Sequence, residues 1–145
     1  MLEATVDKFI FRIPETLRYS DPGIWVSVEG SRARLGLSDF AQQVSGDIAF
    51  ASVAPAGTDL RVGDEFASLE TVKVNVGLLS PVTGRILEVN PLLQDAPELI
   101  NRDPYDKGWI MLIELADWEA DRAALLDAPN YLQRVVEQAR AESKP

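Results

Sequence analysis

The stretch Glu70–Val74, which reads Glu-Thr-Val-Lys-Val, decides the fold because two β-rich runs meet at its lysine, Lys73. Upstream, residues 66–72 place alternate side chains on opposite faces, as in a strand. Downstream, Val74 and Val76 resume the alternation before a Ser-Pro-Val-Thr-Gly turn at residues 80–84. The pattern predicts a central β-hairpin with Lys73 in its turn.

Lys73 differs from an ordinary turn lysine in its surroundings. The chain has only four lysines against ten arginines, and Lys73 alone lies in a strand-like run. Its neighbours are Val72 and Val74, whereas tight turns prefer Gly, Asn or Asp. A turn lysine is usually just a solvated charge. However, an ε-amine can be acylated, while a guanidinium is far too basic. We therefore interpret Lys73 as the attachment point of a covalent cofactor.

Composition limits the classes of protein to which the chain can belong. Its 145 residues, 46% of them hydrophobic and 26% charged, fit one domain over residues 1–145 with a sizeable core. The net charge of −9 argues against nucleic acid and anionic membranes as partners. The N-terminus lacks the pattern of a signal peptide, and no apolar run has the length of a membrane span. We expect a cytoplasmic location.

The absence of cysteine and histidine removes thiol nucleophiles, Ser-His triads and His- or Cys-ligated metals. No run has EF-hand spacing, so we expect no metal site. Only paired carboxylates remain for catalysis, and the sequence marks no such pair, so we expect a non-catalytic protein. Redox or acyl-transfer chemistry must come on a cofactor or from a partner. An unmodified binding module with an acidic surface is the alternative.

The rest of the chain predicts short strands with frequent turns. Residues 1–22 read as one extended segment, and a hairpin follows at residues 24–37. Ser38 can cap a short helix that ends at Gly46. The later expected strands cover residues 47–53, 85–89 and 109–115, the last apolar enough to be central.

A helical part is expected over about residues 117–140. Asp117 can cap a helix over residues 118–127, and Pro129 suits the first turn of a second helix. An apolar stripe on the second helix comprises Tyr131, Leu132, Val135, Val136 and Ala139. The sequence thus predicts a mainly β fold with some α, either a small barrel or a sandwich, with helices at one end.

The residues around Lys73 resemble a known modification motif. Glu70–Val74 is similar to the E-S-V-K-A lipoylation motif of lipoyl carriers, and residues 80–84 resemble the S-P-V-S-G turn of glycine cleavage H proteins. Gly63 matches an upstream glycine, and the resemblance extends over roughly residues 19–132. The chain is thus identified as a member of this H-protein-like family.

The resemblance implies a lipoyl/biotinyl-type barrel-sandwich hybrid with added C-terminal helices. Lipoate would be amide-linked to Lys73 and would act as a swinging arm. Glu70, Thr71, Val72 and Val74 would present the lysine to a lipoate ligase or lipoyl transferase. The dithiolane would supply the thiol-disulfide chemistry that a Cys-free chain lacks.

Three positions depart from the family pattern. In H proteins, the segment S-H-E-W-V contributes a serine and a glutamate to the cleft that receives the aminomethyl-loaded arm. An aspartate four residues after the lysine belongs to the same cleft. Here the first segment reads Pro22–Val26, with Pro22 in place of the serine and Ile24 in place of the glutamate, and Gly77 replaces the aspartate. An amine on the arm would lose charge-assisted acceptors worth roughly 1.5–3 kcal/mol each.

These departures leave two kinds of cargo open. The lipoate-binding proteins of bacterial sulfur oxidation are similar in sequence, carry sulfur, and work with a heterodisulfide-reductase-like complex. Ile24 and Gly77 are compatible with cargo that lacks an amine, so the sequence favours this branch. The alternative is the H protein of the glycine cleavage system, with glycine decarboxylase, aminomethyltransferase and dihydrolipoamide dehydrogenase as partners.

Overall fold

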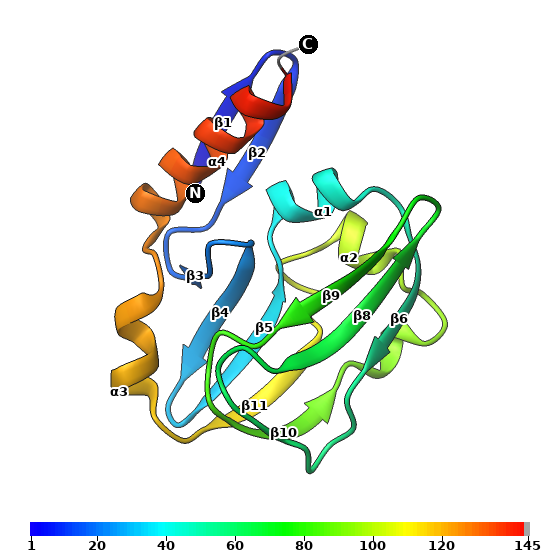
Figure 1. Cartoon of the computed structure of the whole chain (residues 1–145), viewed down its shortest axis with the longest axis vertical. Helices are drawn as coiled ribbons and strands as arrows, with labels where there is room; N and C mark the ends of the chain where they lie inside the picture. The colour runs from blue at the N-terminus through cyan, green and yellow to red at the C-terminus, as the bar shows by residue number, and fades with distance from the viewer. Residues whose placement is uncertain (144–145) are drawn as a thin grey trace.

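The computed structural model describes residues 1–143 and contains three β-sheets and a few helices (Figure 1). One sheet has six strands in the order β3-β4-β5-β11-β10-β7, one has three in the order β6-β8-β9, and β1 pairs with β2. The strands are β1 Leu2–Val6, β2 Phe9–Ile13, β3 Arg18–Tyr19, β4 Ile24–Glu29, β5 Arg32–Leu37, β6 Ile48–Val53, β7 Asp59–Leu60, β8 Glu65–Thr71, β9 Asn75–Leu79, β10 Gly84–Val89 and β11 Met111–Leu115. The helices are α1 Asp39–Ser45, α2 Leu99–Arg102, α3 Trp118–Asp121 and α4 Ala128–Ser143, with 3-10 turns η1 Pro91–Leu93 and η2 Arg122–Ala124.

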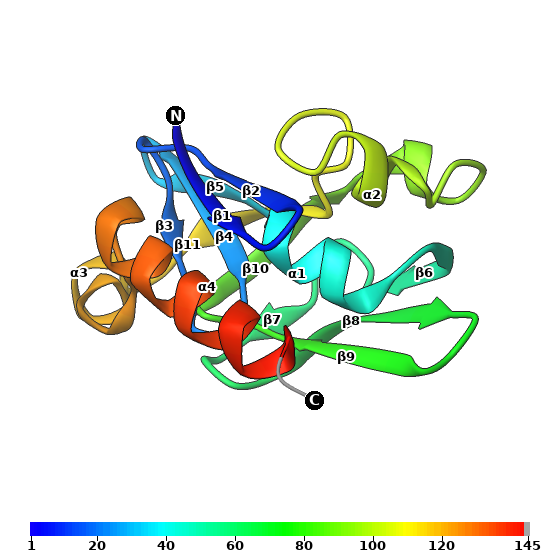
Figure 2. The same ribbon diagram turned by 90° about the horizontal axis from the view of Figure 1, so that it is seen from above.

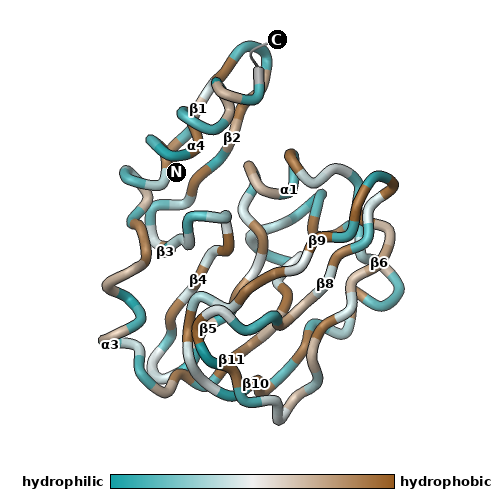
Figure 3. Tube along the Cα trace, viewed as in Figure 1, coloured by the Kyte–Doolittle hydropathy of each residue, from teal (hydrophilic) through white to brown (hydrophobic). Residues whose placement is uncertain are grey.

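The two larger sheets enclose one hydrophobic core. Leu35 and Ile113 from the six-stranded sheet and Leu69 from the three-stranded sheet have no exposed surface. In Figure 3, hydrophobic colour follows much of β4 and β9, which contribute to this core. β11 lies between β5 and β10, as expected of the last apolar strand. This arrangement of sheets agrees with the mainly β fold predicted from the sequence.

A second hydrophobic cluster joins the chain ends. Tyr19 and Tyr131 stack with ring centroids 4.4 Å apart, and α4 packs its buried Tyr131, Val135 and Ala139 against this cluster. Leu132 and Val136 lie partly buried beside them. The apolar stripe predicted for the second helix is therefore confirmed, and Pro129 lies in its first turn.

The prediction of one extended segment over residues 1–22 is wrong. The chain reverses at Asp7-Lys8 and forms the antiparallel hairpin β1–β2 (Figure 1). Asp7 adopts a left-handed backbone conformation with φ of 55°, which aspartate tolerates better than most residues. The reversal escaped prediction because no glycine or proline marks it.

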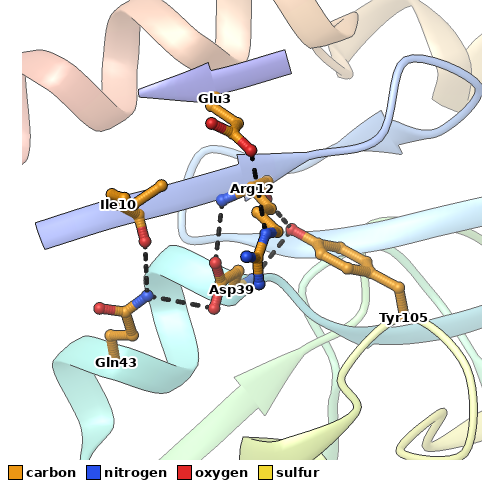
Figure 4. A network of polar contacts seen from close by, with 6 residues as sticks. All are labelled: Glu3, Ile10, Arg12, Asp39, Gln43 and Tyr105. Carbon is orange, nitrogen blue, oxygen red and sulfur yellow. Dashed lines mark hydrogen bonds and ion pairs between the residues drawn. The ribbon is translucent and has the colours of Figure 1, made fainter. Parts of the chain in front are cut away.

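Asp39 at the start of α1 fixes this hairpin to the body of the protein (Figure 4). Its carboxylate accepts hydrogen bonds from the Arg12 amide at 2.8 Å and the Gln43 side chain at 3.1 Å. The Tyr105 hydroxyl donates to the Arg12 carbonyl at 2.6 Å and accepts from the Asp39 amide at 2.9 Å. Gln43 also donates to the Ile10 carbonyl at 3.1 Å. These bonds hold β2 against α1.

The helix expected over residues 118–127 is shorter than predicted. α3 ends at Asp121, the 3-10 turn η2 follows, and Leu125 is extended. Leu126 then forms a β-bridge with Tyr19, exchanging backbone hydrogen bonds of 2.9 and 2.8 Å. Asp117 precedes α3 but makes no side-chain capping bond. Pairing with β3 thus competes with the helix in this segment.

By contrast, the short helix after β5 is confirmed. The Ser38 hydroxyl accepts a hydrogen bond from the Ala41 amide at 3.2 Å, and Gly46 ends α1 with φ of 81°.

Within residues 1–143, no helix is long and apolar enough to cross a membrane.

Candidate cofactor-attachment site

Lys73 lies in the turn of the β8–β9 hairpin, and Thr71 shapes that turn. The Thr71 hydroxyl accepts hydrogen bonds from the amides of Lys73 at 3.3 Å and Val74 at 3.1 Å. It also donates to the Val74 carbonyl at 3.0 Å, beside the Thr71 amide bond to the same oxygen at 2.9 Å. The side chain of Thr71 therefore closes the turn without the glycine that tight turns usually need.

The hairpin tip is open to solvent. Val72 is 91% exposed, Val74 is 54% exposed, and Lys73 is itself exposed. Among residues 1–143, no ion pair involves Lys73. An enzyme can therefore reach this amine without unfolding the chain or breaking a salt bridge. The two valines place exposed apolar side chains on both sides of this amine.

The base of the hairpin is rigid. The Gly63 amide donates to the Ser80 carbonyl, and the Ser80 amide donates to the Asp64 carbonyl, at 2.8 and 2.7 Å. The Ser80 hydroxyl donates to the Val82 carbonyl at 2.6 Å within the following turn. Gly84 packs so closely on the Glu114 carbonyl of β11 that a Cβ would collide with it. The motif at residues 80–84 thus fixes the hairpin to the core.

A groove of about 400 Å³ lies beside the hairpin, between β9, α1 and the end of α4. Apolar side chains dominate its lining, among them Ile24, Leu37, Val44 and Val76. β9 is the edge strand of its sheet, so its outer edge faces this groove. The groove begins at Val74, next to Lys73. An apolar arm attached to Lys73 could therefore pack against the apolar side chains of this groove.

The structure brings together the two positions at which the acids of the family pattern are missing. Ile24 and Gly77 both line the groove, although 53 positions separate them in the sequence. Ile24 is only 2% exposed and belongs to the main core. Gly77 lies on β9, opposite Ser68 of β8.

The sequence also did not predict the position of Glu65, whose carboxylate lies against Gly77 on the face of the hairpin that carries Ser68, opposite to the groove-lining Val76. The Oε1 atom of Glu65 occupies the space where a Cβ of residue 77 would stand, and its carboxyl carbon is 3.1 Å from that point. A β-bulge between Glu65 and Ala67 places Glu65 opposite Leu79. Regular alternation, as read from the sequence, would have put Glu65 on the other face. The sequence signal for this bulge is the consecutive apolar pair Phe66-Ala67, since both residues are buried in the structure.

Glu70, Val72 and Val74 are exposed at the end of the hairpin that carries Lys73. Glu70 is exposed on β8, with Asn75 opposite on β9 and Phe50 opposite on β6. Phe50 is 67% exposed, although an aromatic side chain is more often buried. The residues that the sequence assigned to presentation of Lys73 therefore share one end of the hairpin.

The wall of the groove formed by α1 is supported by a buried polar contact. The hydroxyls of Ser38 and Tyr131 lie 2.6 Å apart and share a hydrogen bond. Burial raises the pKa of Tyr131 to about 12, and the hydrogen bond with Ser38 acts in the opposite direction.

Within residues 1–143, no cluster of acidic side chains has the arrangement of a metal site.

Comparison with known proteins gives a consistent result. The family model described as glycine cleavage H-protein matches residues 17–138. The glycine cleavage system H protein of Brevibacillus brevis is 43% identical over 124 residues, covering 86% of this chain and 98% of that protein. The H protein of Oceanobacillus iheyensis is 42% identical over 119 residues, covering 82% and 94%.

A solved structure agrees with the sequence comparisons. The crystal structure of a glycine cleavage system H protein from Mycobacterium marinum superposes with a TM-score of 0.76 and 26% sequence identity. The superposition covers 84% of this chain and 98% of the Mycobacterium marinum chain. The barrel-sandwich fold predicted from the sequence is thereby confirmed.

Proposed function

The chain belongs to the glycine cleavage H-protein family, whose members are non-catalytic carriers with lipoate on a lysine, and we propose that this lysine is Lys73. The exposed amine at the tip of a firmly based hairpin supports the assignment most directly. We further propose that residues 1–145 act as one carrier unit.

The residues of the chain suit the tasks of a carrier. The bound lipoyl group supplies thiol-disulfide chemistry, which a chain without cysteine lacks. The strands β8 and β9 hold the base of the arm, and tethering replaces diffusion with a high effective concentration at each partner's active site. Amide formation removes the charge of Lys73, so the attached arm can lie in the apolar groove.

We propose that the carrier serves the glycine cleavage system. Its partners would be a lipoate ligase or lipoyl transferase, glycine decarboxylase, aminomethyltransferase and dihydrolipoamide dehydrogenase. The relatives from Brevibacillus brevis and Oceanobacillus iheyensis favour this assignment over the sulfur-oxidation branch that the sequence favoured. The assignment to sulfur oxidation and a heterodisulfide-reductase-like complex gains no support from these comparisons.

Mass spectrometry tests the attachment. Protein co-expressed with a lipoate ligase and supplied with lipoate should gain one lipoyl group, which maps to the peptide containing Lys73. Lys73→Arg should abolish the gain, while the matched variant Lys107→Arg should retain it. Unmodified wild-type protein would contradict the proposal and leave the acidic binding module as the remaining interpretation.

The second test concerns the pathway. The lipoylated wild-type chain should support glycine decarboxylation by a bacterial glycine decarboxylase, and Lys73→Arg should not. Lipoylated protein that the decarboxylase does not use would exclude the glycine cleavage assignment while leaving the carrier assignment intact.

A further inference from the structure

The outer face of the three-stranded sheet carries an exposed aromatic side chain close to the attachment site. The register of β6 and β8 places Phe50 opposite Glu70, and it places Ser52 opposite Ser68. Residues two apart on a strand share one face, so these four side chains lie on the same face of the sheet. Leu69, which lies between Ser68 and Glu70, has no exposed surface and points into the core on the other side. The face that carries Phe50 is therefore the solvent side.

A β-bulge turns Phe50 outward. The register of β6 shifts between Ile48 and Phe50, so Ala49 is the extra residue. Ile48 is 4% exposed in the main core, whereas Phe50 is 67% exposed. In a regular strand these two side chains would share one face, and Phe50 would point into the core with Ile48. The exposure of Phe50 is therefore set by the backbone of β6, an edge strand, where bulges commonly redirect a side chain.

A hollow of about 340 Å³ adjoins the ring of Phe50. Its other lining residues are Ala51, Ser52, Ser68 and Glu70, all on β6 or β8. The small side chains leave room beside the ring for a side chain of a partner. Among residues 1–143, no ion pair involves Glu70, so its carboxylate is available to a basic group. Protein interfaces are enriched in aromatic residues and have polar rims, and this face offers both features.

The partner that must approach this face is the enzyme that modifies Lys73. Glu70 precedes Lys73 by three residues, which is at most about 10 Å of extended chain. A specific interface usually covers about 800 Å² and about 20–30 residues on each partner, far more than the tip of one hairpin. On the groove side, α1 and α4 flank the hairpin, whereas the hollow beside Phe50 is lined by strand residues alone.

We propose that Phe50 and Glu70 form the docking surface of the lipoate ligase that modifies Lys73, with Phe50 as its apolar anchor. The proposal rests on the proposed function and adds a residue of β6 to the recognition of the hairpin. In Figure 1, β6 runs alongside β8 toward the tip that carries Lys73. An enzyme with its active site on Lys73 would thus reach Phe50 with the adjoining part of its surface.

Lipoylation kinetics with a purified lipoate ligase test the proposal. The unmodified chain is the varied substrate, and mass spectrometry follows the gain of one lipoyl group. We expect Phe50→Ser to lower kcat/KM about tenfold or more through a higher KM, with kcat nearly unchanged, because a docking residue contributes to binding rather than to chemistry. Phe50→Tyr keeps the ring and should retain most of the wild-type kcat/KM.

Phe9→Ser is the matched control for this effect. Phe9 is 50% exposed on the β1–β2 hairpin, and its loss should leave kcat/KM unchanged. Acylation of Lys73 by a small N-hydroxysuccinimide ester, mapped by mass spectrometry, should be equally fast in wild type and Phe50→Ser, because the Thr71 hydroxyl still orders the turn. An unchanged kcat/KM in Phe50→Ser, or slower acylation by the small reagent, would overturn the proposal.

The dependence on salt tests the part of Glu70. If its carboxylate meets a basic surface of the ligase, rising ionic strength should lower kcat/KM more steeply in wild type than in Glu70→Gln. An equal dependence in the two proteins would remove Glu70 from the docking surface.

The outcomes separate this proposal from the function on which it rests. If the wild-type chain gains no lipoyl group at Lys73, the proposed attachment fails and the docking surface fails with it. If Lys73 is lipoylated with the same kcat/KM in Phe50→Ser, the docking surface alone fails. A Phe50→Ser variant that is lipoylated normally but used poorly by glycine decarboxylase would assign this face to the decarboxylase and would overturn the proposal.

Discussion

Thr71 shows how a single side chain can prepare an attachment site. Three hydrogen bonds of its hydroxyl order the backbone on both sides of Lys73. We expect Thr71→Val, which has nearly the same shape, to loosen this turn and to slow lipoylation several-fold. The cost in unfolding free energy should be about 0.5–1.5 kcal/mol. Mass spectrometry measures the lipoylation rate, amide exchange of Val74 measures the loosening of the turn, and urea unfolding measures the loss of stability.

Thr58→Val is the matched control for this prediction. The Thr58 hydroxyl donates to the Pro55 carbonyl at 2.7 Å in another exposed turn. Its loss should lower stability to a similar degree but leave the lipoylation rate unchanged. Equal rates for Thr71→Val and wild type would show that the order of the turn does not limit attachment.

The tyrosines of the second core predict a loss of stability at alkaline pH. Burial raises the pKa of Tyr131 from 10.0 to about 12, and it raises the pKa values of Tyr19 and Tyr105 as well. Because the folded-state pKa exceeds the unfolded value, the stabilising contribution is complete below pH 10 and is lost as pH rises toward 12. Urea unfolding across this range should show the decline.

Tyr131→Phe isolates the contribution of one titrating hydroxyl. The variant loses the hydrogen bond to Ser38, which should cost about 1 kcal/mol near neutral pH. However, its stability should fall less than that of wild type between pH 10 and 12, because one titrating group is gone. An identical pH profile would contradict the assignment of the alkaline transition to this residue.

At the scale of elements, the β1–β2 hairpin lies before residue 17, where the family match begins. It covers Val135 and Ala139 of α4 and brings Phe11 edge-on to Phe40 at 5.1 Å. In Figure 2, the hairpin and α4 lie apart from the tip of the β8–β9 hairpin. The added hairpin thus stabilises the walls of the groove rather than the attachment point.

Removal of residues 1–13 should therefore separate stability from modification. We expect a loss of several kcal/mol in unfolding free energy, because exposing one large buried side chain already costs about 1.5–3 kcal/mol. Lipoylation at 20 °C, roughly where mesophilic proteins are most stable, should persist at an unchanged rate. Thermal unfolding and mass spectrometry measure the two. Loss of modification in a protein that remains folded would contradict this separation.

Elements could be predicted where local sequence signals agree. The prediction failed where contacts between distant residues determine the structure. Ser38 and Gly46 mark α1 by their own chemistry, and the turns around Lys73 identify the hairpin. The segment near Leu126 looked helical because its bridge to Tyr19 is invisible in a local pattern. The place of Glu65 depends on a bulge, which shifts every upstream residue to the opposite face.

At the scale of the whole molecule, the groove is the place where three parts meet. β9 comes from the three-stranded sheet, Ile24 from the six-stranded sheet, and α1 and α4 from the second hydrophobic cluster. No sequence window contains more than a part of it, so its existence could not be predicted locally. Its walls are also parts of both cores, which couples any change of its chemistry to the stability of the protein.

Ile24 makes this coupling testable. From the family pattern, Ile24→Glu together with Gly77→Asp would be expected to restore an amine-binding cleft. In the structure, Ile24 is 2% exposed within the main core, and the space at residue 77 already holds the Glu65 carboxylate. We expect the double variant to lose about 2–5 kcal/mol of unfolding free energy, because it buries an unpaired charge and crowds two carboxylates together.

The expected activity of this variant follows from the same geometry. Lipoylated Ile24→Glu/Gly77→Asp should support glycine decarboxylase no better than wild type, although it carries two more acids. The matched variant Ile24→Leu keeps the core apolar and should cost less than about 1.5 kcal/mol. Urea unfolding and decarboxylase assays with each protein measure both effects. A double variant that is as stable as wild type and clearly more active would contradict this expectation and show that the groove tolerates further carboxylates.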